Sequence, residues 1–442
     1  MTDPTGINRR TFMALAGAAA ALPVGNALAA AAPHASAAPP QAPAFVVPPE
    51  RPGVVPFRVQ IPQAALDDLQ VRLAAIRWPE TETVAGWEQG VPLQAARGLI
   101  DHWRHRHDWR QFEQRINAFP QFRTQIDGLG IHFIHARSPH PGALPLLLNH
   151  GWPGSVVEFL QTIERLTEPT RFGGRAEDAF HVVVLSMPGY GFSDKPAGQG
   201  WGIPRIARAW ALLMHERLGY AHWVAQGGDW GAAVTHALAS QRPPGLLAGH
   251  VNLPLVAPLQ RPATPSAEEQ RALDTIEVYL DRKAGYADQM NTRPQTIGYA
   301  LNDSPLALAM WMYEKFGEWS DSSDGPEAAL SRDQMLDDIA LHWFTGTGAS
   351  SARLYWESCD ARTLRSHTFF SAEPVSLPMA ASIFPKETCL APRSWAKAAW
   401  SNLIYWNTVD KGGHFAAFEQ PALFARELWR AFANVRSAPS AT

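Results

Sequence analysis

Short apolar runs alternate with helical patterns between residues 144 and 254, and this alternation is the feature that most restricts the fold. The runs LPLLLNHG, HVVVLSMPG and HWVAQGGDWG each precede a helical pattern, and LLAGHVNLP follows them. Strands that are buried on both faces appear as continuous apolar runs, and helices between them favour parallel pairing. The sequence therefore predicts an α/β protein with a mostly parallel sheet and helices on both faces.

Two helical regions accompany the predicted sheet. From Ser266 to about His367 the pattern is mostly helical, and strand-like runs (SLPMAASIFP, NLIYWNTV) resume only afterwards. A helical insert between late strands predicts a lid over the carboxyl edge of the sheet, where ligands bind in open α/β folds. Before the sheet, amphipathic helices are expected from Pro62 and from about Pro92.

Composition and pattern divide the chain into six segments. The first three are an export signal (1–37), a linker rich in Pro and Ala (38–54) and an N-terminal helical segment (55–121). The others are the first part of the α/β core (122–256), the helical lid (257–370) and the second part of the core (371–437).

The N-terminus has the order of features found in export signals. The pair Arg9-Arg10 precedes a short apolar stretch, and two small-x-small sites follow at Ala27-Leu28-Ala29 and Ala35-Ser36-Ala37. This order resembles a bacterial twin-arginine signal, so we expect a periplasmic or secreted protein. The alternative is a chance arginine pair before an Ala-rich helix.

Composition excludes several classes of function. Lys and Arg number 38 and Asp and Glu 41, a net charge of −3, which argues against a nucleic-acid partner. Only Cys359 and Cys389 are present, so a disulfide framework or Cys-based zinc site is excluded and a single bridge stays open. No metal-binding spacing groups the histidines. No apolar run after residue 40 is long enough to be a transmembrane segment of the mature chain.

The segment Gly227-Gly228-Asp229-Trp230-Gly231 lies between a predicted strand and a predicted helix. It matches the tight turn that presents a nucleophile, with Asp229 where a serine hydrolase has serine. Attack by aspartate on an acyl carbon gives a mixed anhydride, whereas attack on an sp3 carbon gives an ester that water can hydrolyse. Asp229 therefore indicates epoxide opening or carbon–halogen cleavage and not esterase, lipase or peptidase chemistry. The alternative is a glycine-rich turn with a helix cap.

Three further segments are expected to complete this site. In HGWPG, after the strand LPLLLN, the backbone N–H of Trp152 is predicted to form an oxyanion hole with that of Trp230. His414 in GGHF follows the last strand-like run and is the predicted base, and Glu387 in FPKE is the predicted acid. Two other carboxylates are not expected to be the acid. Asp360 belongs to the lid, and Asp410 lies too close to His414 along the chain.

These residues together resemble the epoxide hydrolases of the microsomal type, which have an N-terminal segment before an α/β-hydrolase core. Nine blocks carry the resemblance in order over roughly residues 55–432: IRWPET, FPQFRTQIDGLGIHFIHARS, HGWPGS, SMPGYGFS, GGDWG, ALNDSP, FPKE, PRSW and GGHFAAFEQP. The resemblance implies an α/β-hydrolase fold, a small apolar epoxide as the substrate and no cofactor. It does not cover the export signal.

In that family two lid tyrosines donate hydrogen bonds to the epoxide oxygen, and matching the blocks places them at Tyr286 and Tyr355. Ring opening makes an alkoxide, which two phenol donors in a dry pocket would stabilise. The alternative is lid packing, which is how we interpret the six other tyrosines, such as Tyr279 and Tyr313.

The implied mechanism is attack by Asp229 on an epoxide carbon while Tyr286 and Tyr355 hold the oxygen. Water activated by His414 and Glu387 then hydrolyses the ester to a vicinal diol. Two alternatives are a haloalkane dehalogenase and a catalytically silent α/β-hydrolase-fold protein that binds a small apolar ligand. The sequence leaves open which epoxide is used, the regio- and enantiopreference, and the oligomeric state.

Overall fold

The computed structural model of the chain describes residues 45–258, 261–323, 325–358 and 375–436. Every described residue belongs to one compact unit, Pro43–Thr442. The expected export signal, Cys359 and Asp360 therefore lie outside the described residues. Within the described ranges, no helix is long and apolar enough to cross a membrane.

One sheet organises the described part of the chain, in the order β1-β2-β3-β5-β4-β6-β7-β8-β9. Its strands are β1 (Val54–Phe57), β2 (Gln121–Ile126), β3 (Leu129–Ala136), β4 (Leu144–Asn149), β5 (Phe180–Leu185), β6 (Trp223–Gly227), β7 (Leu246–Val251), β8 (Met379–Ile383) and β9 (Leu403–Thr408). Pairing is antiparallel from β1 through β2 and β3 to β5, and parallel from β5 to β9. The predicted mostly parallel sheet is thus confirmed, and only the edge strand β1 has no signal in the Pro-rich sequence around it.

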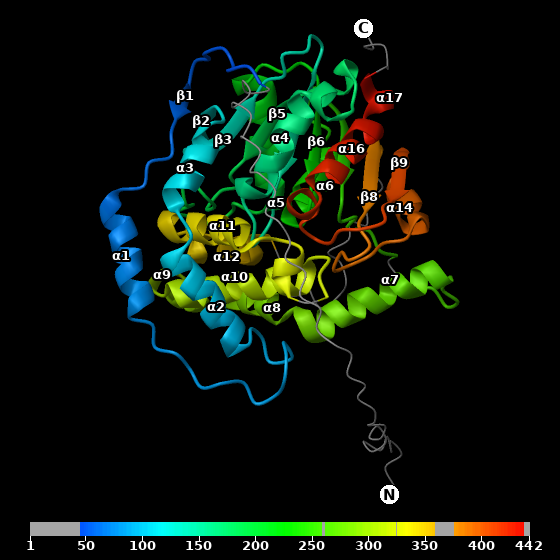
Figure 1. Cartoon of the computed structure of the whole chain (residues 1–442). Helices are drawn as coiled ribbons and strands as arrows, with labels where there is room; N and C mark the ends of the chain where they lie inside the picture. The colour runs from blue at the N-terminus through cyan, green and yellow to red at the C-terminus, as the bar shows by residue number, and fades with distance from the viewer. Residues whose placement is uncertain (1–44, 259–260, 324, 359–374, 437–442) are drawn as a thin grey trace, which may run out of the picture. The chain divides into compact units, whose positions relative to one another are not determined.

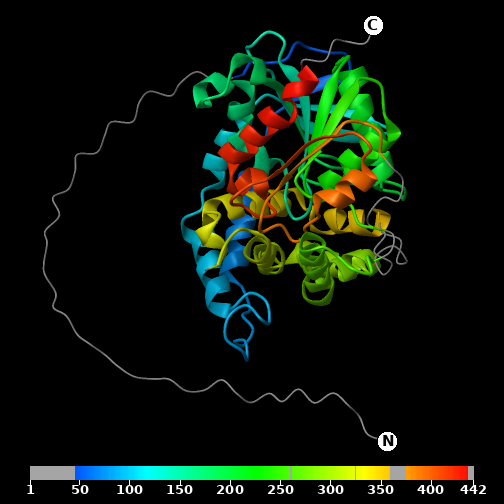
Figure 2. The ribbon, with the colours of Figure 1, turned by 90° about the vertical axis from the view of Figure 1, so that its right-hand side faces the viewer.

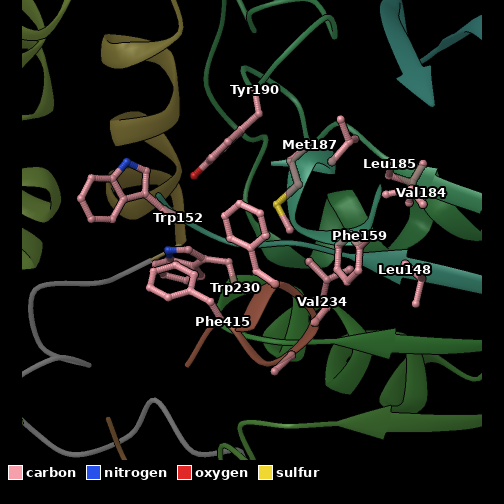
Figure 3. Close-up of a cluster of buried hydrophobic side chains, with 14 of the residues drawn as sticks. Leu148, Trp152, Phe159, Val184, Leu185, Met187, Tyr190, Trp230, Val234 and Phe415 are labelled. Atoms are coloured by element: carbon pink, nitrogen blue, oxygen red, sulfur yellow. The ribbon is translucent and has the colours of Figure 1, made fainter. Parts of the chain in front are cut away.

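Helices cover both faces of this sheet. α5 (Ile203–Leu212) and α6 (Trp230–Gln241) pack together on one face, and α4 (Leu160–Thr167) and α16 (Pro421–Ala431) on the other (Figures 1 and 2). The remaining elements of the core are η1 (Val156–Phe159), η2 (Pro169–Phe172), η3 (Ala176–Asp178), η4 (Leu213–Arg217), α14 (Arg393–Ala399), α15 (Ala416–Glu419) and α17 (Ala433–Arg436). Figure 3 shows part of the buried core. The rings of Trp152, Trp230 and Phe415 lie on the left of this view, and aliphatic side chains such as Leu148 on β4 and Val184 on β5 lie on the right.

The predicted helical insert forms a lid at one end of the sheet (Figure 1). It contains α7 (Ala267–Val278), η5 (Tyr279–Lys283), α8 (Gly285–Thr292), α9 (Pro294–Asp303), α10 (Pro305–Trp319), η6 (Pro326–Ala328), α11 (Arg332–Thr345) and α12 (Gly348–Ser358). A capping box begins α7: Ser266 N–H donates to the Glu269 carboxylate at 2.9 Å, and Glu269 N–H donates to Ser266 Oγ at 3.3 Å.

The N-terminal helices α1 (Gln63–Ala74), α2 (Leu93–His105) and α3 (Trp109–Asn117) pack against the lid. His102 Nε2 lies 2.7 Å from Asp333 Oδ1, and Arg72 donates to the backbone carbonyl of Asp303 at 2.9 Å. The helical region expected from about Pro92 is divided into α2 and α3, and Asp108 caps the start of α3. The N-terminal segment thus supports the lid helices from outside.

Candidate active site

Asp229 stands in a tight turn between β6 and α6. Its φ of +50° and ψ of −129° are strained for a residue with a side chain. The turn depends on its glycines, because a Cβ on Gly227 would overlap the backbone of Gly231, and a Cβ on Gly231 would overlap the carbonyl of Asn149 at the end of β4. The turn places the Asp229 carboxylate at the carboxyl end of the sheet, as the nucleophile motif predicts.

The HGWPG loop after β4 reaches this carboxylate, because β4 and β6 are parallel neighbours. Trp152 N–H donates to Asp229 Oδ1 at 2.8 Å. A Cβ on Gly151 would overlap the same oxygen, so only glycine allows the loop to approach so closely. Trp152 thereby lies where an oxyanion-hole donor is expected, and Trp230, the second predicted donor, is the first residue of α6 directly after Asp229.

His414 and Glu387 form a buried pair beside Asp229. His414 Nδ1 lies 2.6 Å from Glu387 Oε1, and His414 Nε2 lies 3.4 Å from Asp229 Oδ2. Lys386 N–H donates to the carbonyl of Gly412 at 3.1 Å, which aligns the loop after β8 with the loop after β9. The structure thus brings the predicted nucleophile, base and acid together, although they come from three separate loops.

The carboxylates around His414 favour its protonated form. Burial alone would lower the pKa of His414, but Glu387 and Asp229 together hold that pKa well above its ordinary value. Glu419 fixes the loop that carries the imidazole, because its carboxylate accepts the N–H groups of Gly413 and Phe415 at 3.0 Å each. The base is therefore oriented from both sides.

Tyr286 of α8 and Tyr355 of α12 lie buried together in the lid, with their hydroxyl oxygens 3.4 Å apart. The Tyr286 ring stacks on Trp152 with centroids 5.0 Å apart, and the Tyr355 ring meets Trp230 edge to face at 4.8 Å. Burial raises the pKa of each phenol well above its ordinary value, so both keep their protons at neutral pH. The two predicted donors therefore pack on the neighbours of Asp229: Tyr286 on Trp152, which is hydrogen-bonded to Asp229, and Tyr355 on Trp230, which follows Asp229 in the chain.

The structure adds Tyr279 to this pair. Its hydroxyl lies 2.9 Å from that of Tyr286, whereas Tyr313, which the sequence also suggests is packing, donates to Glu327 at 2.7 Å. The seven-residue spacing between Tyr279 and Tyr286 is the one signal that could have indicated the contact. Lys315 is buried on the apolar helix α10, and its Nζ lies 4.8 Å from the centre of the Tyr286 ring. The sequence pattern did not indicate this contact either.

Within the part of the chain that the structure describes, no group of three or more His, Cys, Asp or Glu side chains is arranged to hold a metal ion. The site brings together the carboxylate of Asp229, the His414–Glu387 pair, the backbone N–H of Trp152 and the phenols of Tyr286 and Tyr355.

Two family models match this chain. The model described as epoxide hydrolase N terminus matches residues 54–159, and the model described as alpha/beta hydrolase fold matches residues 145–290. Together they span the N-terminal helices, the first part of the core and the start of the lid.

Similar proteins cover most of the chain. A relative from Stigmatella aurantiaca that bears an epoxide hydrolase name is 57% identical over 87% of this chain and 86% of its own. Epoxide hydrolase 1 of Sus scrofa is 34% identical over 84% of this chain and 87% of its own. The solved structure of Aspergillus niger epoxide hydrolase is 32% identical with a TM-score of 0.77, covering 89% of this chain and 100% of that one. The juvenile hormone epoxide hydrolase of Bombyx mori is 28% identical with a TM-score of 0.78, covering 87% and 95%.

Proposed function

Because the chain belongs to the epoxide hydrolase family of the microsomal type, we propose that it converts an epoxide and water into a vicinal diol through a covalent ester on Asp229. The arrangement of the Asp229 carboxylate supports this most directly. One of its oxygens accepts the Trp152 N–H at 2.8 Å, and the other lies 3.4 Å from the base His414. A carboxylate held in this way can both attack carbon and later be released by activated water.

In the first step, an oxygen of Asp229 bonds to an epoxide carbon while the ring C–O bond breaks. The departing oxygen becomes an alkoxide, and the hydroxyls of Tyr286 and Tyr355 donate hydrogen bonds to it as its charge develops. The high pKa of both phenols keeps these protons available. The packed rings around the two tyrosines keep the site dry and favour an apolar epoxide.

In the second step, the change of charge on Asp229 activates the base. Once Asp229 is an ester it no longer carries a negative charge, so one of the two groups that raise the pKa of His414 is lost. The imidazolium gives up its proton to the alkoxide, and the neutral imidazole then takes a proton from water as the water oxygen adds to the ester carbon. Backbone N–H groups of Trp152 and Trp230 would hold the resulting oxyanion while Glu387 stabilises the imidazolium. Collapse restores the carboxylate and frees the second oxygen of the diol, which takes the hydrogen left on the added water oxygen, while His414 keeps the other hydrogen of the water and is again an imidazolium.

We propose further that residues 1–37 export the protein by the twin-arginine route to the periplasm or the medium. The support is the order of the features: Arg9-Arg10, then an apolar stretch, then two small-x-small sites.

A single turnover in H2(18)O with enzyme in excess over styrene oxide tests the proposed reaction. The diol should carry no label, because its new oxygen comes from Asp229, and the label should appear in the peptide that contains Asp229. His414→Gln should form the ester but fail to release it. Labelled diol and an unlabelled peptide on the first turnover would mean that water attacks the epoxide directly, and would reduce Asp229 to a general base.

A further inference from the structure

A small cavity of about 20 Å³ lies beside the reacting groups, lined by Asp229 and His414. A cavity needs roughly 10–15 Å³ of such space to hold one water molecule, so this one has room for a single water and not for an organic substrate. The cavity therefore concerns the hydrolytic step of the proposed function, and not binding of the epoxide.

One wall of this cavity carries hydrogen-bond acceptors. Asn149 and Gln226 both line it and are buried, and their side-chain oxygens have no hydrogen-bond partner within the described residues. Their amide nitrogens are already used: Asn149 donates to the carbonyl of Gln226 at 3.2 Å, and Gln226 donates to Asn252 Oδ1 at 2.9 Å. Buried acceptors without a donor are costly, and they make the lining of this cavity polar, which is the kind of site that holds a water molecule.

Glu158 brings a carboxyl group to the same cavity, from η1 just after the HGWPGS block. Its side chain folds back over Gly154, where any Cβ would overlap the carboxyl oxygen. Burial is the main cause that raises the pKa of Glu158 well above its ordinary value, and Asp338 adds to it. The charges of Asp229 and His414 act on this pKa in opposite directions, so Glu158 senses both reacting groups. Neither alkylation of Asp229 nor hydrolysis of the ester, as proposed, assigns a role to Glu158.

We propose that this cavity seats the hydrolytic water and that Glu158 is the residue that positions it. The inference rests on the proposed function, because it concerns only hydrolysis of the ester on Asp229. The water donates one hydrogen to His414 Nε2 and the other to the carboxyl oxygen of Glu158. Since the wall formed by Glu158, Asn149 and Gln226 presents acceptors, the lone pairs of the water turn away from it and towards the ester carbon.

Rapid quenching with peptide mass spectrometry separates the two steps in variants of Glu158. With styrene oxide and enzyme in excess, alkylated Asp229 peptide is followed as it forms and as it disappears. Glu158→Ala should leave ester formation within about 2-fold of the parent and slow ester loss about 10- to 100-fold, the cost of a misplaced reacting group. Glu158→Gln keeps an acceptor oxygen and should recover most of the loss rate, which a purely structural role would not predict.

Two further variants control for folding and for general effects of charge. Gly154→Ala keeps the carboxyl group of Glu158 but displaces it, because the new Cβ would overlap its oxygen. This variant should also slow ester loss. It replaces Glu158→Ala as the test if Glu158→Ala does not fold. Glu164→Gln, on the following helix α4 and away from the cavity lining, should change neither rate.

These experiments separate the role of Glu158 from the two-step reaction on Asp229. Ester loss at the parent rate in both Glu158→Ala and Gly154→Ala, or an equal slowing of formation and loss, would overturn the role of Glu158 alone. Absence of any ester on Asp229 in His414→Gln would overturn the two-step reaction, and the water-positioning role with it.

Discussion

The hydroxyl oxygens of Tyr286 and Tyr355 lie 3.4 Å apart, although the two residues are 69 positions apart in the chain. Trp152 contacts both rings, with centroid distances of 5.0 Å and 6.1 Å. The same residue donates its backbone N–H to Asp229. Trp152 therefore contacts both the proposed nucleophile and the two proposed phenol donors. A shift of the HGWPG loop would change the position of the attacking carboxylate and of the hydroxyls that bind the epoxide oxygen.

Removing the hydroxyls of this pair should slow alkylation without unfolding the protein. Tyr286→Phe or Tyr355→Phe alone should slow formation of the Asp229 ester roughly 10- to 1,000-fold, because each removes one donor to the alkoxide. The double variant should be nearly inactive while its circular dichroism stays unchanged. Tyr313→Phe is the matched control, since its hydroxyl is engaged with Glu327. Near-native single-turnover alkylation in the double variant would show that the pair only packs the lid.

Gly151→Ala should abolish alkylation, because the new Cβ would overlap the carboxylate of Asp229. We expect a loss of at least about 100-fold in the rate of ester formation, the scale expected when a reacting group moves by about 1 Å. Gly198→Ala is the control, since a Cβ at Gly198 meets nothing within 4 Å. The measurement is single-turnover ester formation on Asp229. An active Gly151→Ala enzyme would mean that the HGWPG loop is not held against the nucleophile.

The free energy of unfolding should fall as the pH decreases from about 6.5 towards 4, because an unfolded histidine binds a proton in this range. Burial is the main cause that keeps the folded-state pKa of seven described histidines low, to about 3 for two of them and about 4 for the others: His132, His135, His150, His181, His236, His250 and His342. The folded state thus binds fewer protons than the unfolded state. Burial has the opposite effect on three carboxyls: it raises the pKa of Glu158 well above its ordinary value, that of Asp338 to about 8 and that of Glu419 to about 7, but these groups are fewer than the histidines.

His236→Leu isolates one of these histidines. Its Nε2 has no partner within the described ranges, so leucine breaks no hydrogen bond of that atom. Between pH 6.5 and 4 the slope of unfolding free energy against pH should decrease by up to about 1.4 kcal/mol per pH unit, the value for one proton. Urea unfolding at several pH values measures the slope. Above pH 8 the slope should not change, because the imidazole is neutral in both states; an unchanged slope at acid pH would mean that His236 is protonated in the folded protein.

Export should depend on the arginine pair. Replacing Arg9 and Arg10 with lysine should trap the uncleaved precursor in the cytoplasm, since the twin-arginine route recognises both side chains. Cell fractionation and immunoblotting report the size and location of the chain, with the unaltered chain as the control. Cleaved protein outside the inner membrane of the double variant would refute this route.

The sequence by itself predicted the nucleophile, the base, the acid and a mostly parallel sheet, because each has a local signature. The glycines around Asp229 mark a strained turn that no other residues allow, and carboxylate chemistry alone indicates attack on an sp3 carbon. Short apolar runs separated by helical patterns predict parallel strands whose loops meet at one edge, which is why Glu387 and His414 could be expected near Asp229.

Only the tertiary structure decided how segments without such signatures meet. The contact of Tyr279 with Tyr286 depends on how η5 is oriented relative to α8, and the pairing of β1 with β2 joins segments more than sixty residues apart. The place of Glu158 depends on a side chain that folds back over Gly154, beside acceptors from two different strands. Long-range packing and burial create these relationships, and apart from the seven-residue spacing of Tyr279 and Tyr286 no local pattern of residues indicates them.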